Sequence, residues 1–257
     1  MAHKVRTNIL DVLNDQQLMG HLAPYRGNPM QSMVYFEDDF LVDTLNGDYW
    51  AESVGNGGVT LTLAAAANGT ATTAVNATDN DVAEIYGPAL YYARQACVFE
   101  CRLKVNAITT VSFAAGFANA ASATNDKIVF DATTDTLTAG TNITDAAVFL
   151  FDTDATTDRW FAAAINASGT PQGGVMATGI VPAADTYEVL KVAFNAAGDA
   201  GFYRNGVCVY SIPLAVAPTV ALRPYFALKG CATTARLLTV DYVKVWQNRL
   251  ETSTVVW

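Results

Sequence analysis

The chain has 257 residues, of which only 15% are charged, and its formal net charge is −9. Its 15 Lys and Arg residues are scattered, whereas nucleic-acid binding needs clustered positive charge, so we expect no nucleic-acid partner. No uninterrupted apolar stretch reaches the roughly 18 residues of a membrane-spanning helix, so we expect no membrane partner.

The first 33 residues differ from the rest of the chain. Val5, Ile9 and Leu13 recur at helical spacing, and a segment with two prolines and Tyr25 follows them. We predict a helical and extended N-terminal arm over residues 1–33, whose apolar residues contact neighbouring subunits. Because the segment lacks the apolar core of a signal peptide, we expect synthesis in a cytoplasm.

From residue 34 onward the pattern predicts strands. About a dozen short segments are rich in β-forming residues, and many alternate apolar and polar residues. These segments are 34–42, 59–64, 97–106, 110–118, 127–132, 147–151, 159–166, 186–195, 200–205, 207–212, 220–229 and 236–247. Without intervening helices, they predict an all-β fold, a two-sheet antiparallel jelly roll over residues 34–249.

Two local patterns refine this prediction. Asn205 and Gly206 between two predicted strands indicate a tight type I′ hairpin. Strict alternation in the last strand places Leu238, Val240 and Tyr242 on one face, opposite Val243.

The C-terminal tail over residues 250–257 ends in Val255, Val256 and Trp257. Such an apolar end is unusual on a soluble monomer. We expect it to dock on a neighbouring subunit or on its own domain.

The four cysteines do not suggest disulfides. Cys97 and Cys101 fall in one predicted strand, where residues four apart lie about 13 Å from each other, too far for a disulfide. Cys208 and Cys231 fall elsewhere, and no spacing matches a zinc site. We expect buried free thiols.

Three segments resemble a known family. These are FEDDFLVDTLNGDYW (36–50), GFYRNGVCVYSIPL (201–214) and LLTVDYVKVWQ (237–247). They are similar to the opening and closing strands of concanavalin-A-like jelly rolls of the laminin-G and laminarinase type, over residues 34–248. The resemblance implies that the first and last strands are neighbours, in a fold that hosts lectins, hydrolases and structural modules.

The residues required for hydrolysis in that family are not found. Its hydrolases carry Glu-x-Asp-x-x-Glu on a strand, so that two carboxylates share a face. Glu37 and Asp39 share a face, but they belong to the segment that is structural in the family. His3 and His21 both lie in the arm, which argues against a catalytic triad. We therefore expect no enzymatic activity and no catalytic residues.

Two binding sites are considered. Asp152, Asp154 and Asp158 are spaced like the start of a calcium-binding loop, but the Gly and the terminal Glu of such a loop are missing, and a solvated acidic hairpin loop is the favoured explanation. No other cofactor is expected. Tyr92 and Trp160 are candidates for stacking on sugars, with core packing as the alternative.

A second resemblance concerns the biological context. The Ala- and Thr-rich composition, the arm and strings such as ALYYARQACVFECRLKVN are similar to structural proteins of tailed bacteriophages. This implies a homo-oligomer, commonly a trimer, bound to the major capsid protein or another virion protein and located in the virion. The expected function is thus a capsid decoration (cement) protein that stabilises the outer capsid surface. The alternatives are an adhesin that recognises host surface polysaccharide and a divergent glycoside hydrolase.

Overall fold

The computed structural model describes residues 33–41, 46–55, 59–64, 69–122, 127–176 and 180–249. The chain divides into one unit of residues 35–247 and another made of residues 1–34 with 248–257. Most of the second unit lies outside the described residues. The arm contacts proposed for Val5, Ile9, Leu13 and Tyr25, the tail contacts of Val255, Val256 and Trp257, and the domain boundaries therefore stay predictions.

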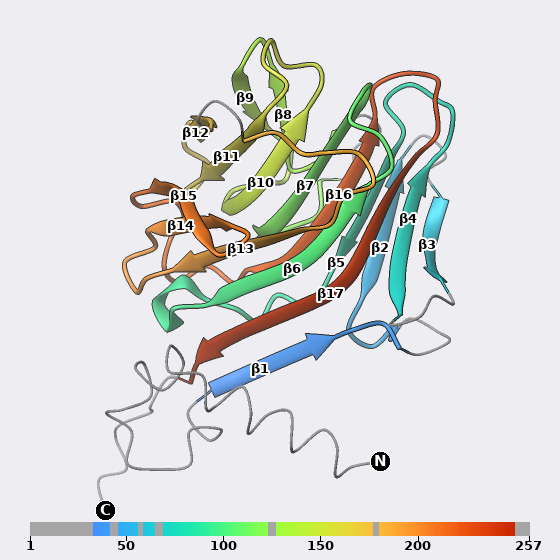
Figure 1. The fold of residues 1–257 in the computed structure, drawn as a ribbon. Coiled ribbons are helices and arrows are strands. Elements are labelled where there is room, and N and C mark those ends of the chain that lie inside the picture. The colour runs from blue at the N-terminus through green and yellow to red at the C-terminus, as the bar shows by residue number, and fades with distance from the viewer. Residues whose placement is uncertain are drawn as a thin grey trace, which may run out of the picture. The chain divides into compact units, whose positions relative to one another are not determined.

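Residues 35–247 form a sandwich of two large antiparallel sheets (Figure 1). Sheet A has the order β15 (Val207–Ile212), β14 (Ala200–Arg204), β13 (Glu188–Phe194), β6 (Val98–Val105), β17 (Arg236–Asn248), β4 (Thr70–Val75) and β3 (Val59–Ala64), and β1 (Met33–Asp38) also pairs with β17. Sheet B has the order β12 (Gln172–Val175), β11 (Trp160–Ile165), β10 (Ala146–Asp152), β7 (Val111–Ala118), β16 (Arg223–Gly230), β5 (Val82–Tyr86) and β2 (Ala51–Gly55). The hairpin of β8 (Phe130–Thr133) and β9 (Thr136–Ala139) completes the strands.

This architecture confirms the predicted two-sheet β sandwich. The pairing of β1 with β17 agrees with the neighbouring first and last strands that the family resemblance implies. Asn205 and Gly206 have φ values of 50° and 82° between β14 and β15, as a type I′ hairpin requires. None of the described residues forms a helix long and apolar enough to cross a membrane.

The main core lies between the two sheets. In β6, Phe99, Cys101, Leu103 and Val105 are buried, while the residues between them are partly exposed. This alternation points one face of sheet A into the sandwich and the other face toward solvent.

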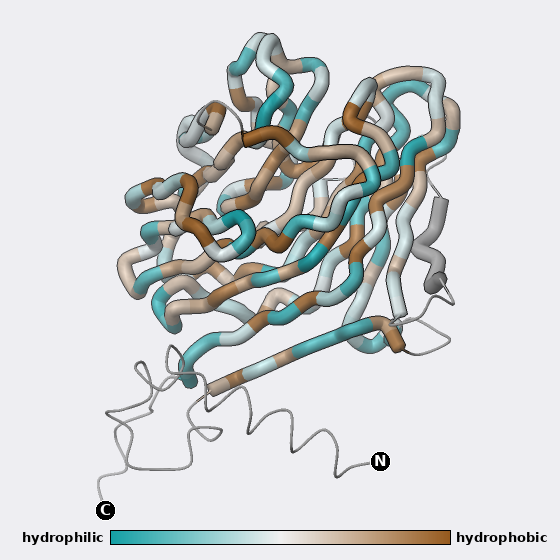
Figure 2. The backbone as a smooth tube through the Cα atoms, viewed as in Figure 1, coloured by the Kyte–Doolittle hydropathy of each residue, from teal (hydrophilic) through white to brown (hydrophobic). Residues whose placement is uncertain are grey.

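The last strand departs from strict alternation. Hydrophobic and hydrophilic residues alternate along β17 (Figure 2), but the pairing with β6 shifts register between Val240 and Tyr242. This irregularity reverses the side-chain phase, so Val240 and Val243 are both buried while Asp241 and Tyr242 are partly exposed. The prediction that Tyr242 shares a face with Leu238 and Val240 is therefore wrong.

The central strands of sheet B are covered on both faces. Every residue of β7, β10 and β11 is buried. On the face turned away from sheet A, these strands and β16 form a second apolar cluster with residues of the 127–143 segment, among them Ile128, Phe130 and Ile143. This covering segment, which includes the β8–β9 hairpin, leaves the outer face of sheet A as the broad open sheet face within residues 35–247.

Candidate functional site

The entrance of the domain is fixed by Asp38. Its carboxylate accepts hydrogen bonds from the backbone N–H of Phe40 at 2.9 Å and from Nε1 of buried Trp50 at 2.8 Å. This residue therefore has the structural role that the family resemblance implies for the segment. Its neighbours Glu37 and Asp39 instead line a surface pocket.

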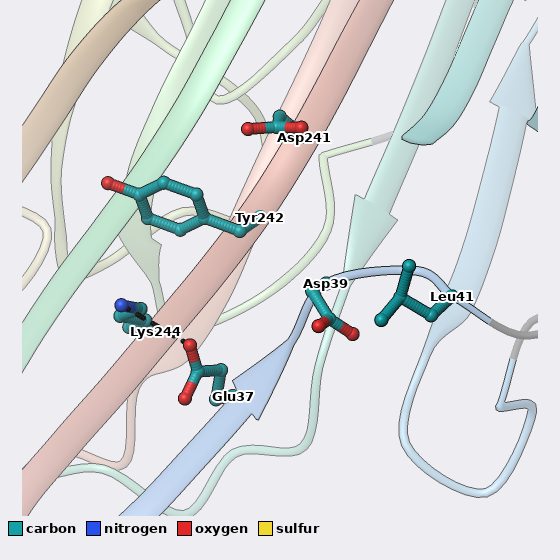
Figure 3. Close-up of a pocket in the computed structure, with 6 residues that line it drawn as sticks. All are labelled: Glu37, Asp39, Leu41, Asp241, Tyr242 and Lys244. Carbon is teal, nitrogen blue, oxygen red and sulfur yellow. Dashed lines mark ion pairs between the residues drawn. The ribbon is translucent and has the colours of Figure 1, made fainter. Parts of the chain in front are cut away.

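That pocket lies where β1 meets the outer face of β17 (Figure 3). It has a volume of about 270 Å³, and its lining residues are Glu37, Asp39, Leu41, Asp241, Tyr242 and Lys244. Lys244 Nζ lies 3.2 Å from Glu37 Oε1, and Figure 3 shows the two side chains turned toward each other. Three carboxylates against one ammonium give the pocket a net negative charge.

Hydrogen bonds and ion pairs fix the groups around the pocket. Asp241 Oδ2 lies 2.7 Å from Arg102 Nη1, and the Tyr242 hydroxyl donates to Glu100 Oε1 at 3.3 Å. The Tyr35 hydroxyl donates to Glu37 Oε2 at 2.6 Å. Burial, together with the adjacent carboxylates, raises the pKa of Tyr35 and of Tyr242 above the ordinary value. Both phenols are therefore protonated donors at neutral pH.

The pocket continues into a charged row across sheet A. Register pairs place Glu100 of β6 beside Lys191 of β13 and Lys244 of β17, and Lys191 beside Tyr203 of β14. Together with the ion pair of Lys244 and Glu37, the row alternates negative and positive groups over the four strands β1, β17, β6 and β13. Opposite charges directly across strands stabilise such a row, although exposed pairs contribute at most about 1 kcal/mol each.

Four partly exposed tyrosines accompany this row on the outer face of sheet A, and we call them the tyrosine strip. They are Tyr35, Tyr187, Tyr203 and Tyr242. The Arg102 guanidinium lies 4.2 Å from the Tyr187 ring centroid, and Lys191 Nζ lies 4.8 Å from that of Tyr203. Aromatic faces beside fixed donors and acceptors can hold ligands that are apolar on one side and hydroxylated at the edge.

The two sugar-stacking candidates from the sequence have different outcomes. Trp160 is 1% exposed and packs edge-on against Phe113 and Phe149 in the core, so the prediction that it contacts a glycan is wrong. Tyr92 is partly exposed, with the Arg94 guanidinium 5.2 Å from its ring centroid, but it does not line the pocket. Its role in glycan contact stays a prediction.

The structure changes which residues could form the predicted calcium site. Asp152 is buried and Asp154 is exposed, and their carboxylates lie together with the Cys231 thiol. In the part of the chain that the structure describes, this is the group of three whose potential ligand atoms lie within 4.8 Å of one another, and Asp158 is not in it. The prediction that Asp158 joins Asp152 and Asp154 in one site is therefore wrong.

All four cysteines are free thiols, as expected, but not all are buried. Cys97 and Cys101 are buried on the inner side of sheet A, while Cys231 is partly exposed. Cys208 is exposed on β15, at the edge of sheet A, so the prediction of burial is wrong for it.

Sequence reasoning missed most of the pocket and the tyrosine strip. Glu37 and Asp39 were placed on one face correctly, and both line the pocket. The sequence pattern does not distinguish Tyr35 and Tyr187 from other tyrosines, and strict alternation predicts the wrong face for Tyr242. The signal that could have found Tyr242 is the apolar phase change across Asp241, where Val240 and Val243 cannot both face inward without a bulge.

No known protein-family model matches the chain, and no curated protein matches it in sequence. Solved structures do match. A β-glucanase of Bacillus licheniformis has a TM-score of 0.58 at 13% identity, covering 84% of this chain and 98% of its own. The carbohydrate recognition domain of Emp47p has a TM-score of 0.57 at 8% identity, covering 87% of this chain and 100% of its own. The chain has a concanavalin-A-like jelly-roll fold. A protein of unknown function, SO2946 from Shewanella oneidensis MR-1, is similar over 94% of this jelly roll's chain and 98% of its own, with a TM-score of 0.59 at 14% identity.

These neighbours correct the expectation that this jelly roll is not an enzyme. A glucanase shares its fold over most of both chains, so the missing Glu-x-Asp-x-x-Glu motif is not sufficient ground to exclude catalysis. None of these three structures is named for a virion protein, so the capsid decoration role finds no support in them. The virion location, the capsid partner and the trimer stay predictions.

Proposed function

We propose that this jelly roll recognises a neutral polysaccharide along the outer face of sheet A, with the Tyr242 pocket as the principal subsite. The observation that carries the proposal is the pocket itself, where an aromatic ring, three carboxylates and an ammonium converge on the open face of the sandwich. Two solved structures of the same fold are named for a glucanase and for a carbohydrate recognition domain, which supports a sugar ligand.

The chemistry of the pocket fits a sugar ring. A pyranose presents C–H groups on its face and hydroxyl groups at its edge. The face suits the Tyr242 ring, and the hydroxyls suit Glu37, Asp39 and Lys244, since carboxylates accept and ammonium donates. The volume of about 270 Å³ is slightly below the roughly 300–1,000 Å³ of small-molecule pockets, which suits one unit of a polymer that extends beyond it.

Charge selects the class of polymer. With Glu37, Asp39 and Asp241 against Lys244, the pocket repels a polyanion, and the chain as a whole carries −9. A neutral glucan is therefore favoured over a polyuronate.

The tyrosine strip gives such a polymer a path away from the pocket. Tyr242 pairs in register with Arg102, whose guanidinium lies over Tyr187, and Glu100 leads through Lys191 to Tyr203. Contacts spread along this path would add to the affinity of a single subsite.

The proposal is tested by isothermal titration of the full chain with lichenan, laminarin and, as the acidic comparison, a polyuronate. We expect binding to a neutral glucan that Tyr242→Ala weakens about tenfold, equivalent to about 1.4 kcal/mol. Tyr86→Ala is the matched control, since Tyr86 is a partly exposed tyrosine on β5 of sheet B, away from the pocket. The proposal that the pocket is a sugar subsite would be refuted if no neutral glucan bound. It would also be refuted if both variants lost affinity equally.

The same samples are assayed for cleavage, because the fold also carries a glucanase. Release of reducing ends that Glu37→Gln abolishes would make the pocket a catalytic site, with its carboxylates as the acid and base groups. Binding without release would leave recognition as its function.

A further inference from the structure

A second cluster of reactive side chains lies on sheet B, apart from the pocket. Asp152 ends β10, Asp154 follows in the next turn, and Cys231 comes directly after β16. Their potential ligand atoms lie within 4.8 Å of one another, and the Cys231 Sγ to Asp152 Oδ1 distance is 4.0 Å. Atoms this close can share one small ion.

Ser112 of β7 is an independent sign of a missing ligand. It pairs in register with Asp152 on one side and with Lys229 on the other, so the three side chains project from the same face of the sheet. Ser112 is 0% exposed, and its Oγ has no hydrogen-bond partner among the described residues. Buried hydroxyls are nearly always hydrogen-bonded, so an orphaned one beside Asp152 indicates an additional group there.

The charges around the cluster are unbalanced. Asp131, Asp152 and Asp154 are opposed by Lys229, whose Nζ lies 3.2 Å from Asp131 Oδ1. A cation bound between these carboxylates would offset the excess of negative charge.

The carboxylate of Asp152 is already oriented. The backbone N–H of Ala132 donates to Oδ2 at 2.9 Å, and that of Asp154 donates to Oδ1 at 3.0 Å. Hydrogen bonds of this kind fix ligand carboxylates in metal sites, and each oxygen retains a lone pair for an ion.

We propose that Asp152, Asp154 and Cys231 bind one thiophilic divalent cation of the Zn²⁺ type, with Ser112 beside the ion and solvent at the open position. One thiolate and two carboxylates suit Zn²⁺, which is commonly four-coordinate. Ca²⁺ prefers six to eight oxygen ligands and gains nothing from sulfur. The exposed side of Asp154 gives the ion access from solvent.

The test uses the full chain with Zn²⁺ titrated calorimetrically and with Co²⁺ as a spectroscopic probe of sulfur coordination. We expect one ion per chain and a cobalt–thiolate absorption band. Cys231→Ser should abolish the band and weaken Zn²⁺ binding at least tenfold, and Asp154→Asn should weaken it similarly. Unchanged circular dichroism verifies that both variants fold.

Matched controls separate this site from other ligands in the chain. Cys208→Ser removes the exposed thiol, Asp158→Asn removes the neighbouring loop carboxylate, and His3→Ala with His21→Ala removes both histidines. All three should leave binding within twofold of the parent. The proposal would be overturned if Zn²⁺ did not bind, or if Ca²⁺ bound more tightly than Zn²⁺. It would also be overturned if Zn²⁺ binding survived in Cys231→Ser but was lost in one of the control variants.

Discussion

Trp160 and Glu188 join the two sheets through a buried hydrogen bond. Nε1 of Trp160, on β11 of sheet B, donates to Oε2 of Glu188, on β13 of sheet A, at 3.2 Å. The same carboxylate receives a two-point contact from Arg204, with Nε 2.5 Å from Oε2 and Nη2 2.8 Å from Oε1. Glu188 thus connects the core tryptophan of one sheet with an arginine at the margin of the other.

Removing that carboxylate should strongly destabilise the fold. Glu188→Ala leaves the Trp160 N–H and the Arg204 guanidinium without their acceptor, and we expect the free energy of unfolding to fall by about 3 kcal/mol. Urea unfolding followed by tryptophan fluorescence measures the change. Asp79→Ala, at an exposed position, is the control and should change stability by less than about 0.5 kcal/mol. Equal effects of the two variants would contradict the role of Glu188.

Gly116 should be intolerant of even one added carbon. It lies in β7 where a Cβ would be 2.4 Å from the Ala147 carbonyl oxygen and 2.8 Å from Val148 Cα, both backbone atoms of β10. Gly116→Ala therefore forces two central strands apart, with an expected loss of about 3 kcal/mol and a lower midpoint in thermal unfolding. Gly47→Ala, where a Cβ would meet nothing within 4 Å, should leave the midpoint nearly unchanged.

Alkaline pH should unfold the protein through buried tyrosines. The hydroxyls of Tyr49 and Tyr91 lie 2.8 Å apart, and burial raises the pKa of both above the ordinary 10.0. A raised folded-state pKa contributes stability that is complete below the unfolded-state value of about 10 and is lost as the pH rises through the folded-state value.

The unfolding free energy, measured in urea between pH 9 and pH 12, should accordingly fall with pH. Tyr91→Phe removes one of these groups and should make the slope shallower by up to about 1.4 kcal/mol per pH unit. A slope identical to that of the parent would show that Tyr91 already ionises in the folded protein.

The four thiols should react in a fixed order with a disulfide reagent in the presence of a chelator. Exposed Cys208 reacts first, and Cys231 follows slowly because burial raises its pKa and the thiolate is the reactive form. Cys97 and Cys101 are fully buried and should react only with global unfolding. Cys208→Ser should remove the fast phase alone, and a native fast phase of two thiols would be inconsistent with the structure.

The sequence predicts the sheets better than it predicts the surfaces. Two features that depend only on neighbouring residues in the sequence are confirmed. They are the alternation of apolar and polar residues in 97–106 and the turn at Asn205 and Gly206. The predicted segments do not include β2, β4, β5, β9 or β12. Sequences such as TATTAV in β4 show little contrast between apolar and polar positions.

The site depends on features with weaker signals. The pocket requires the bulge at Asp241, and the Asp152, Asp154 and Cys231 cluster requires β10 and β16 to flank β7. Neither a single irregular residue nor the order of distant strands follows from periodicity. The burial of Trp160 was equally inaccessible, because an aromatic residue in a strand reads the same whether it packs inward or binds a ligand.

The 127–143 segment covers the outer face of sheet B, so the two outer faces of the sandwich differ: one is covered and the other is open. Because β7, β10 and β11 are buried on both faces, a polymer bound as proposed would lie against the strands that flank β17. Successive copies bound to one filament would then all present the same back to the surroundings. A covered back of this kind could contact other molecules without competing for the bound polymer.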